Sequence, residues 1–356
     1  MRRLGCDILG GVRPYRSSTK GRVVESEIVN ILDVEPAALR PLLEAESRAW
    51  ETELHWDYSA SSRLISTWLE ERRLSGYTLR SDGKIRGFCF YFLEGPRAHI
   101  ADLFIEPNQA ELMYAKQLLD RVLRHLLTSP QTHRVEAQLP HFSFESLAPW
   151  FRIHCFEGYI REFMAVPLST SNTAESIASE TSSRSKGDFE IAPWERCHDR
   201  QAAELLYHAY HHHVDAAINE QYASLAGVSR LLENVVYHHG CGEFLGQASF
   251  VAFHRPTRKL AGILGATRVR RETAHLPQIA VGVEFQGAGV GTALLRRGLN
   301  HLQCQGFREV SLTATSLNHG AIRLYQRLGF RTFRAFGAFV WQRHSKDSSS
   351  TLTNAM

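Results

Sequence analysis

The sequence lacks the features that mark a membrane-spanning protein, a structural zinc protein or a nucleic-acid binder. Its longest unbroken apolar run, 88–93, has six residues, whereas a helix needs about 20 to cross a bilayer. The 6 cysteines lie far apart and form no C-x-x-C pair, so we expect no structural zinc site and reduced thiols, as in a cytoplasmic protein. The formal net charge is only +4, too small for a nucleic-acid partner.

The composition is that of a globular chain with room for two domains. Of the 356 residues, 44% are hydrophobic and 22% charged, and a domain typically holds about 100 to 200 residues. The stretch 169–188 is rich in Ser and Thr and poor in large apolar side chains, so it predicts a linker. It separates two segments, 24–168 and 189–343, which lie between a flexible basic tail at 1–23 and a second flexible tail at 344–356.

The two segments show the same order of hydrophobic patterns, which indicates a tandem duplication. In each, a strand and two helices come first, three strands follow, and a helix, a strand and a short final helix complete the unit. In the first segment we expect strands at 28–31, 77–80, 85–93, 99–105 and 134–139. In the second we expect strands at 189–191, 249–253, 261–269, 279–285 and 309–315. The predicted fold class is α/β (α+β), with two tandem domains that each hold a mostly antiparallel mixed sheet flanked by helices.

A glycine-rich stretch follows the expected strand 279–285. It reads Gln286-Gly287-Ala288-Gly289-Val290-Gly291-Thr292 and leads into an amphipathic helix. Main-chain N–H groups at a helix start, the helix dipole and the missing Cβ atoms favour binding of an anion such as pyrophosphate. A simple tight turn is the alternative. The third glycine comes one residue early for a dinucleotide-binding G-x-G-x-x-G, and the loop has no lysine for a Walker motif.

The loop resembles the acyl-CoA loop of the GNAT superfamily of N-acetyltransferases, whose pattern is Gln or Arg, two residues, Gly, one residue, Gly or Ala. Gln286, Gly289 and Gly291 match this pattern. A second block, 318–330, begins about 27 residues beyond the loop and contains the superfamily's N-x-x-A-x-x-L-Y and terminal G-F. The resemblance covers the second segment well, and the first segment only through the order of its elements.

The resemblance implies that acetyl-CoA is the co-substrate and that the central strands of the sheet splay apart. The pantetheine arm would add to the strand edge near 279–283, and the glycine loop would hold the pyrophosphate. Arg296, Arg297 or Arg323 would approach the adenosine phosphate, or else form a solvated helix face. The residues expected to contact the carrier are Val281, Val283, Gln286, Gly287, Ala288, Gly289, Val290, Gly291, Thr292, Asn318 and Tyr325.

Tyr325 is the expected catalytic residue. It follows Asn318 by seven positions, which places both side chains on one face of a helix. The departing CoA thiolate needs a proton, and a phenol with an ordinary pKa of about 10 can supply it. The resemblance implies this general-acid role, and a core aromatic beside Leu324 and Leu328 is the alternative. The general base stays open among Glu243, Glu284, Asp215 and a histidine.

Two further stretches have several interpretations. The histidine-rich stretch 208–215 has helical spacings that suit a metal site, a wall of an acceptor pocket or a polar exposed face. We assign no metal to it. Its candidate side chains are His208, His211, His212, His213 and Asp215. Cys241 follows two histidines and is either a thiol nucleophile beside a base or part of a turn.

The first segment has no counterpart of the glycine loop. The corresponding stretch, 106–112, contains no glycine, and a carboxylate at the helix start would repel pyrophosphate by about 1 kcal/mol or more. Phe144 and Phe151 stand at the approximate counterparts of Asn318 and Tyr325. We therefore expect a degenerate half that has lost CoA binding and serves as scaffold or as one wall of the acceptor site. A retained but divergent second site is the alternative.

These observations predict an N-acetyltransferase that moves an acetyl group from acetyl-CoA to a primary amine of a small molecule or peptide, by direct attack in a ternary complex. A non-catalytic acyl-CoA sensor or interaction protein is one alternative, and an oxidoreductase that binds NAD is another. We expect no nucleic-acid or membrane partner. The sequence leaves the acceptor, the acyl-chain preference and the oligomeric state open.

Overall fold

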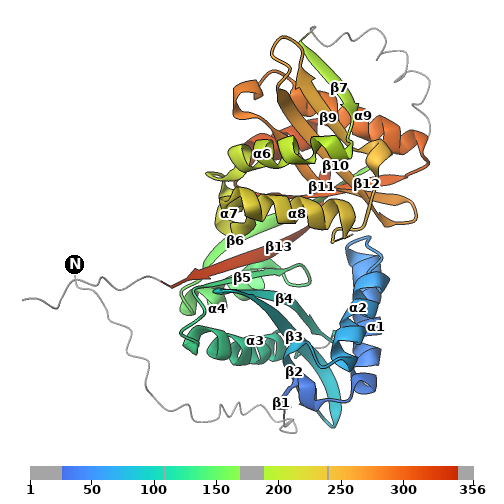
Figure 1. Cartoon of the computed structure of the whole chain (residues 1–356). Coiled ribbons are helices and arrows are strands. Elements are labelled where there is room, and N and C mark those ends of the chain that lie inside the picture. The colour runs from blue at the N-terminus through green and yellow to red at the C-terminus, as the bar shows by residue number, and fades with distance from the viewer. Residues whose placement is uncertain (1–25, 108–109, 169–187, 239, 344–356) are drawn as a thin grey trace, which may run out of the picture.

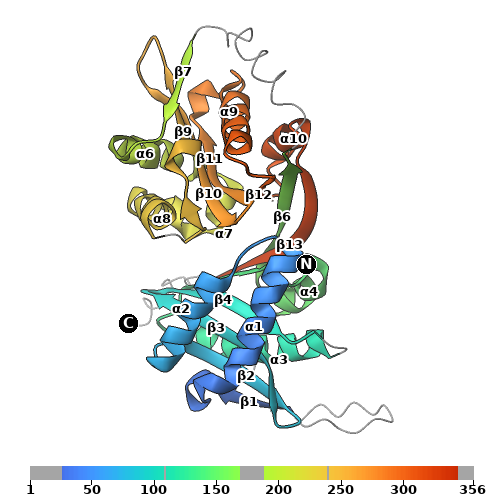
Figure 2. The ribbon, with the colours of Figure 1, turned by 90° about the vertical axis from the view of Figure 1, so that its right-hand side faces the viewer.

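The computed structural model describes residues 26–107, 110–168, 188–238 and 240–343. The two expected tails and nearly all of the expected linker lie outside these ranges. None of the helices within them is both long and apolar enough to cross a membrane. Figures 1 and 2 show two lobes, one from each half of the chain, joined by long strands.

The first half follows the predicted order and adds one strand. Its helices are α1 (Pro36–Glu53), α2 (Ser59–Glu70), α3 (Glu111–Thr128) and α4 (Phe144–Ile153). Its strands are β1 (Ser26–Asn30), β2 (Ser75–Ser81), β3 (Lys84–Glu94), β4 (Arg97–Ile105), β5 (Arg134–Leu139) and β6 (Glu157–Pro167).

The second half repeats this order, which confirms the tandem arrangement. Its helices are α6 (Asp199–Tyr210), α7 (Val214–Ile218), α8 (Leu225–Tyr237), α9 (Val290–Cys304) and α10 (His319–Arg327), with the short 3₁₀ turns η4 (Glu220–Ala223) and η6 (Val283–Phe285). Its strands are β7 (Phe189–Pro193), β8 (Glu243–Phe244), β9 (Phe250–His254), β10 (Leu260–Arg270), β11 (Thr273–Val281), β12 (Glu309–Thr315) and β13 (Arg331–Gln342).

The last strand of each half, β6 and β13, was missed by the sequence analysis, and these two strands join the halves. The sheet runs in the order β1-β2-β3-β4-β5-β13-β6-β12-β11-β10-β9-β7. Strand β13 pairs with β5 of the first half, whereas β6 pairs with β12 of the second half, and β6 and β13 pair with each other. Each half thus lends its final strand to the other, and one continuous sheet crosses both lobes (Figure 2). How the chain divides into domains therefore stays a prediction.

Helices cover both faces of each lobe. In the second half, α6 and α8 pack on one face through Leu206 and Leu232, and α9 packs on the other through Leu294. Successive residues of β10 show the alternation, since Ile263 belongs to the first cluster and Leu264 to the second. The first lobe is built likewise, with α1 and α2 on one face and α3 and α4 on the other. The mixed, helix-flanked sheet that the sequence predicts is confirmed.

The exchange predicts that the two lobes unfold together. Phe339 of β13 is buried in the core of the first half, where its ring stacks on that of Phe151 at 3.9 Å between centroids. Phe339→Ala should lower the free energy of unfolding by about 3 to 5 kcal/mol. Hydrogen exchange during urea unfolding should show β4 and β11 losing protection at the same, lower midpoint. Phe333→Ala, at the half-buried start of the same strand, is the control and should lower the free energy of unfolding less. If the two lobes unfolded at independent urea midpoints, the exchange of β6 and β13 would not link their stabilities.

Candidate active site

Strands β11 and β12 run parallel and then separate. They pair only where Thr273–Leu276 lies opposite Glu309–Leu312. At that point β11 carries one more residue than β10. Gln278 lies opposite Gly265 and His275 lies opposite Thr267, so three steps along β11 match two steps along β10. Pro277 sits in this bulge and has no N–H to donate. The carboxyl end of β11 is therefore free of β12, as the family resemblance implies.

A narrow cavity of about 50 Å³ lies at this split, which we call the wedge cavity. Residues from both faces of the sheet line it. Tyr210, Asp215 and Tyr222 come from the α6 face, and Asn318 and Tyr325 from the α10 side. Arg161 reaches it from β6 and is the contribution of the first half. Sequence reasoning missed Arg161, Tyr210 and Tyr222.

The glycine loop forms an open, uncapped helix start. Helix α9 begins at Val290, its N-cap residue Gly289 has φ 87°, and no side chain caps it. Gly287 also has a positive φ of 78°. A Cβ added at either glycine would meet no atom within 4 Å. The positive φ, and not crowding, is therefore what favours glycine at these two positions, and there is open space beside the chain. Uncapped N–H groups at a helix start in open space can bind an anion.

The start of α9 lies at the mouth of the split. A Cβ added to Gly291 would lie 3.4 Å from Val281 Cγ2 and 3.5 Å from Leu324 Cδ2. Gly291 therefore lies between the end of β11 and α10. Gln286 is exposed, with its Nε2 3.5 Å from the carbonyl oxygen of Val281. Val283 differs from expectation: β11 ends at Val281, and Val283 lies in η6 with an exposed side chain.

The remaining loop residues differ in exposure, and Val290 is buried in the core of the second half. Ala288 is exposed, and Thr292 is partly buried in the first turn of α9. The arginine side chains of Arg296, Arg297 and Arg323 are also exposed. Arg297 lies over the ring of Phe250, 5.7 Å from its centroid. The exposed positions of the three arginines fit the interpretation that they form a solvated helix face.

Tyr325 lies inside the wedge cavity. Its side chain is only 7% exposed, and burial, with a smaller effect of the Asp215 charge, raises its pKa above the ordinary value, against an opposing effect of Arg161. The phenol therefore stays protonated at neutral pH. Asn318 differs from the expected helical position, because it is the N-cap of α10 and its Oδ1 accepts a hydrogen bond from the Ala321 N–H at 3.1 Å. Both residues nevertheless line the same cavity.

Asp215 anchors a charged network at the other side of the cavity. Arg161 Nη1 donates to Asp215 Oδ1 at 2.7 Å and to Thr315 Oγ1 at 2.8 Å, and the Thr315 hydroxyl also donates to Asp215. Burial alone would raise the pKa of Asp215, but the hydrogen bond of His213, the charge of Arg161 and the Thr315 hydroxyl together lower it. Asp215 is therefore an ionised anchor and a weak base.

The other suggested bases lie on the surface, outside the lining of the wedge cavity. Glu284 is exposed and pairs with Lys259 at 3.5 Å, and Glu243 is exposed and pairs with Arg268 at 3.1 Å. Cys241 also lies outside the cavity lining, and desolvation raises its pKa to about 11. Its thiol is thus protonated at neutral pH, which disfavours a cysteine nucleophile.

The histidine-rich stretch does not gather around one point. His211 Nδ1 lies 3.1 Å from the Tyr207 carbonyl oxygen, and His213 Nδ1 lies 3.3 Å from Asp215 Oδ2. Across the described ranges, no three or more His, Cys, Asp or Glu side chains are grouped so that they could hold a metal ion. None of these histidines lines the wedge cavity; Asp215 does, and His213 contacts it.

In the first half a phenylalanine stands in place of the tyrosine at the corresponding split. Strands β4 and β5 also pair only over their first residues, Arg97–Ile100 and Arg134–Ala137. Phe151 occupies the place of Tyr325. The Phe151 carbonyl oxygen accepts a hydrogen bond from the Phe156 N–H at 3.1 Å, and the Tyr325 carbonyl oxygen accepts one from the Phe330 N–H at the same distance. Phe151 is fully buried and stacks on Phe339. The half therefore offers no hydroxyl at this position.

Comparison with known proteins identifies the family. A family model described as the acetyltransferase (GNAT) family matches residues 37–141 and 235–330, which together are more than half of the chain. The chain belongs to the GNAT family. Both halves of this GNAT protein carry a match, so the first half is a GNAT domain by sequence as well as by strand order.

Individual relatives of this GNAT protein match over short stretches. An uncharacterized N-acetyltransferase of Methanocaldococcus jannaschii is 41% identical over 61 residues, 17% of this chain and 27% of the relative. The mycothiol acetyltransferase of Actinosynnema mirum is 44% identical over 77 residues, 22% of this chain and 26% of the relative. The chain thus spans about a quarter of the length of these relatives. Acyl transfer is the reaction that the family supports.

Solved structures confirm the tandem fold. A tandem GNAT protein from the clavulanic acid biosynthesis pathway superposes with a TM-score of 0.57 at 16% identity, over 91% of this chain and 100% of that chain. A GCN5-related N-acetyltransferase from Sphaerobacter thermophilus gives a TM-score of 0.61 at 14% identity, over 92% of this chain and 98% of that chain. At these identities the likeness concerns the fold.

The Asp215 network predicts a large cost for removing Arg161. Arg161→Ala leaves the buried carboxylate of Asp215 without its cation and should lower the free energy of unfolding by about 3 to 5 kcal/mol. Arg161→Ala with Asp215→Ala should recover part of this loss, since no unpaired charge remains. Arg258→Ala, which breaks an exposed pair with Glu190, is the control and should cost less than about 1 kcal/mol. Equal losses for Arg161→Ala and Arg258→Ala in urea titrations would show that the network does not stabilise the fold.

Proposed function

We propose that the second half transfers an acetyl group from acetyl-CoA to a primary amine of a small molecule or peptide. The observation that carries the proposal is the alignment of three features along one split in the sheet. The uncapped start of α9 lies at its mouth, the unpaired edge of β11 follows it, and the protonated Tyr325 lines the cavity within. This order suits a phosphate group, an extended arm and a thioester.

Open space at the glycines supports the carrier site. Gly287, Gly289 and the N–H groups that follow would bind the pyrophosphate, and Val281 would lie beside the pantetheine arm. Main-chain groups of β11 beyond Leu276 face no partner on β12, so they can pair with an extended amide chain as another strand would. Gln286, Ala288, Val290, Gly291, Thr292 and Asn318 complete the proposed carrier site.

Direct attack is the mechanism that we propose. The neutral amine adds to the thioester carbonyl, the C–S bond breaks as the amide forms, and Tyr325 gives its phenolic proton to the departing thiolate. The buried Nε of Arg161 has no hydrogen-bond partner among the described residues, so it is available to a polar group of the bound substrate. The proton that the amine loses passes to solvent or to a base that we do not assign.

Gly289→Glu tests the carrier site. The substitution places a carboxylate at the proposed phosphate site and a side chain at a positive φ, and it should raise the Kd for acetyl-CoA at least about 100-fold, measured by calorimetry. Gly306→Glu is the matched control, because Gly306 also has a positive φ, 85°, and open space around its Cβ position. It should bind acetyl-CoA normally. Normal binding by Gly289→Glu would place the phosphates elsewhere.

Tyr325→Phe tests the proton donor. The variant should lower kcat by about 100-fold or more while the Kd for acetyl-CoA changes less than about threefold, because general acid catalysis acts on the chemical step. Tyr114→Phe removes another buried hydroxyl, one paired with Ser81 at 3.2 Å in the first half, and should leave kcat unchanged. If the wild-type chain binds acetyl-CoA but acetylates no amine, the protein is an acyl-CoA sensor. Binding of NAD without acetyl-CoA would reject the acyltransferase.

A further inference from the structure

Two buried carboxyl groups lie side by side at the split of the first half. Asp102 stands on β4 two residues beyond the last β4–β5 pair, Ile100 with Ala137, and Glu46 of α1 lies beside it. Glu46 is 0% exposed and Asp102 is 6% exposed. Two carboxyl groups in one buried place are costly unless something compensates their charge.

No cation compensates this charge. Neither carboxyl forms an ion pair with a lysine or an arginine in the part of the chain that the structure describes. The nearby ring of His141 packs edge to face on that of Trp50, with 5.3 Å between centroids. Burial and the charge of Arg334, whose Nη2 donates to the His141 carbonyl oxygen at 2.6 Å, lower the pKa of His141 to about 4. His141 is therefore uncharged at neutral pH.

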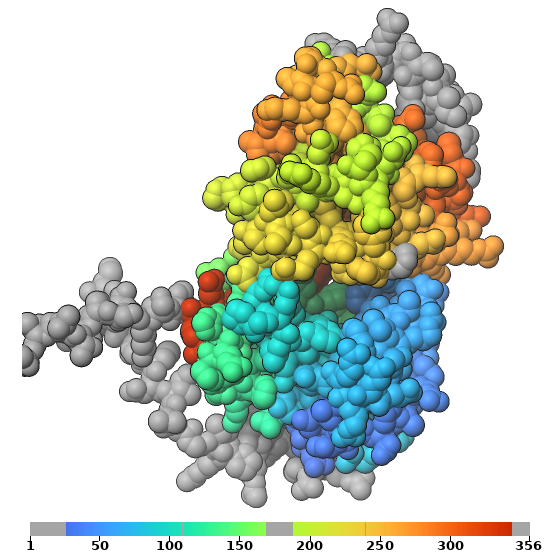
Figure 3. All heavy atoms as spheres, in the orientation of Figure 1, coloured from blue at the N-terminus to red at the C-terminus, as the bar shows by residue number. Residues whose placement is uncertain are grey.

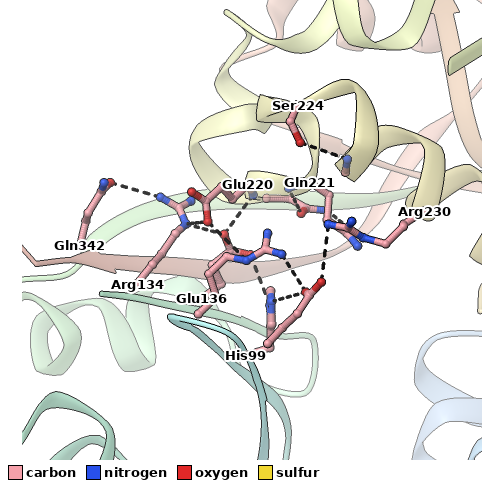
Figure 4. A network of polar contacts seen from close by, with 12 residues as sticks. His99, Arg134, Glu136, Glu220, Gln221, Ser224, Arg230 and Gln342 are labelled. Atoms are coloured by element: carbon pink, nitrogen blue, oxygen red, sulfur yellow. Dashed lines mark hydrogen bonds and ion pairs between the residues drawn. The ribbon is translucent and has the colours of Figure 1, made fainter. Parts of the chain in front are cut away.

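Other buried carboxylates of this protein have a cation beside them. Glu136 of β5 pairs with Arg134 at 2.5 Å and accepts a hydrogen bond from the Glu220 N–H at 3.0 Å, as Figure 4 shows. Asp215 is bound by Arg161 at 2.7 Å. The Glu46–Asp102 pair is buried as deeply and has no such partner, so its charge must be reduced in another way.

The oxygens of Glu46 show what is missing. Among the described residues, five buried side-chain N or O atoms have no hydrogen-bond partner, and four of them belong to Glu46, Trp50 and His141. Both Glu46 oxygens are in this set and are sealed from water, so a bound water does not supply the missing contact. A proton on Glu46 does supply it. The O–H group then donates to the Asp102 carboxylate, which also accepts a hydrogen bond from the Tyr58 hydroxyl at 3.0 Å.

The electrostatics of the surroundings favour the same proton. Burial raises the pKa of Glu46 well above its ordinary value, and the charge of Asp102 raises it further. Burial also raises the pKa of Asp102, against the lowering effect of hydrogen bonds from Glu46 and Tyr58. Burial raises the pKa of Tyr58 and that of the Cys89 thiol on β3, so both stay uncharged at neutral pH.

The pair lies beneath a corner of the first half that contacts the second half. This corner, residues 54–58, joins α1 to α2 and ends at Tyr58, the residue that donates to Asp102. The Asp57 N–H donates to the Val269 carbonyl oxygen at 2.8 Å. Figure 3 shows the blue atoms of α1 and α2 against the second lobe. The carboxyl pair therefore supports a point of contact between the lobes.

We propose that Glu46 and Asp102 share one proton at neutral pH, and that this proton holds the α1–α2 corner against the second half, so that the contact weakens as the pH rises. When the corner opens and water reaches the pair, Glu46 releases the proton to solvent. The pair is a pH-sensitive element of the fold, and it does not depend on the proposed acyl transfer.

The sign of the pH dependence follows from the two states. The pKa of Glu46 is higher in the folded chain than in the unfolded chain, where it has its ordinary value. The folded chain thus binds more protons. Its stability is full below the unfolded pKa and is lost as the pH rises toward the folded pKa.

Glu46→Gln in the full chain tests the shared proton, because the glutamine amide can donate to Asp102 at every pH. Urea unfolding in weakly buffered solution at pH 7 should release about one more proton from the wild type than from Glu46→Gln. Between pH 5 and pH 9 the urea midpoint of the wild type should fall relative to that of the variant. Glu44→Gln, at an exposed position of the same helix, is the matched control and should behave as the wild type does.

Amide hydrogen exchange of the Asp57 N–H tests the contact with the second half. The protection of this N–H in the wild type, divided by that in Glu46→Gln at the same pH, should fall by up to about tenfold per pH unit, because each opening that hydrates the pair releases one proton. Comparison at equal pH cancels the intrinsic exchange rate. A ratio that stays within twofold from pH 5 to pH 9 overturns the role of the proton at the corner.

Equal proton release by the wild type and Glu46→Gln overturns the shared proton itself. If Glu46→Gln does not fold, carbon-13 spectra of the side-chain carboxyl groups in the wild type decide the question. One carboxyl of the pair that stays protonated at pH 7 supports the shared proton, and ionisation of both Glu46 and Asp102 at that pH overturns it.

Discussion

Antiparallel pairing between β6 and β12 is the constraint on which the rest of this molecule depends. It continues the sheet of one lobe into the other and fixes the register that places Arg161 directly opposite Thr315. Because residues opposite each other point to the same face, the guanidinium of a first-half residue meets a second-half hydroxyl, and it also pairs directly with Asp215. The charge network of the wedge cavity thus follows from a backbone pairing.

The two halves show how one backbone serves two purposes. Both have a parallel strand pair that separates after about four residues and a final helix that ends in a positive φ, at Cys155 in one half and Gly329 in the other. The first half places Phe151 at its split, where it stacks on Phe339 from the other half's last strand. A phenylalanine offers no hydroxyl there and adds apolar packing, so it strengthens the joint between the lobes.

Local patterns made most of this predictable. The glycine loop and the block around Tyr325 are short stretches whose residues fix backbone angles and helix starts, and strand order followed from repeated hydrophobic patterns. Strands β6 and β13 were missed because neither shows a clean alternation: Arg161 and Glu162 interrupt the apolar residues of β6, and β13 is interrupted by a bulge. Arg161 was missed because a lone arginine in the sequence gives no sign of a partner at Asp215, 54 residues away.

The charge arrangement also shows how the first half contributes to the segment Val214–Ala223 of the second half. Asp215 keeps its charge in a buried place through the hydrogen bond of His213, the charge of Arg161 and the Thr315 hydroxyl, and that charge contributes to the raised pKa of Tyr325. A segment free to lift would expose Asp215 to water and weaken both effects. Bonds from Arg134 and Glu136 tie the segment down from the opposite side. The first half, which has no glycine loop, thereby helps to hold the buried carboxylate of Asp215 in position.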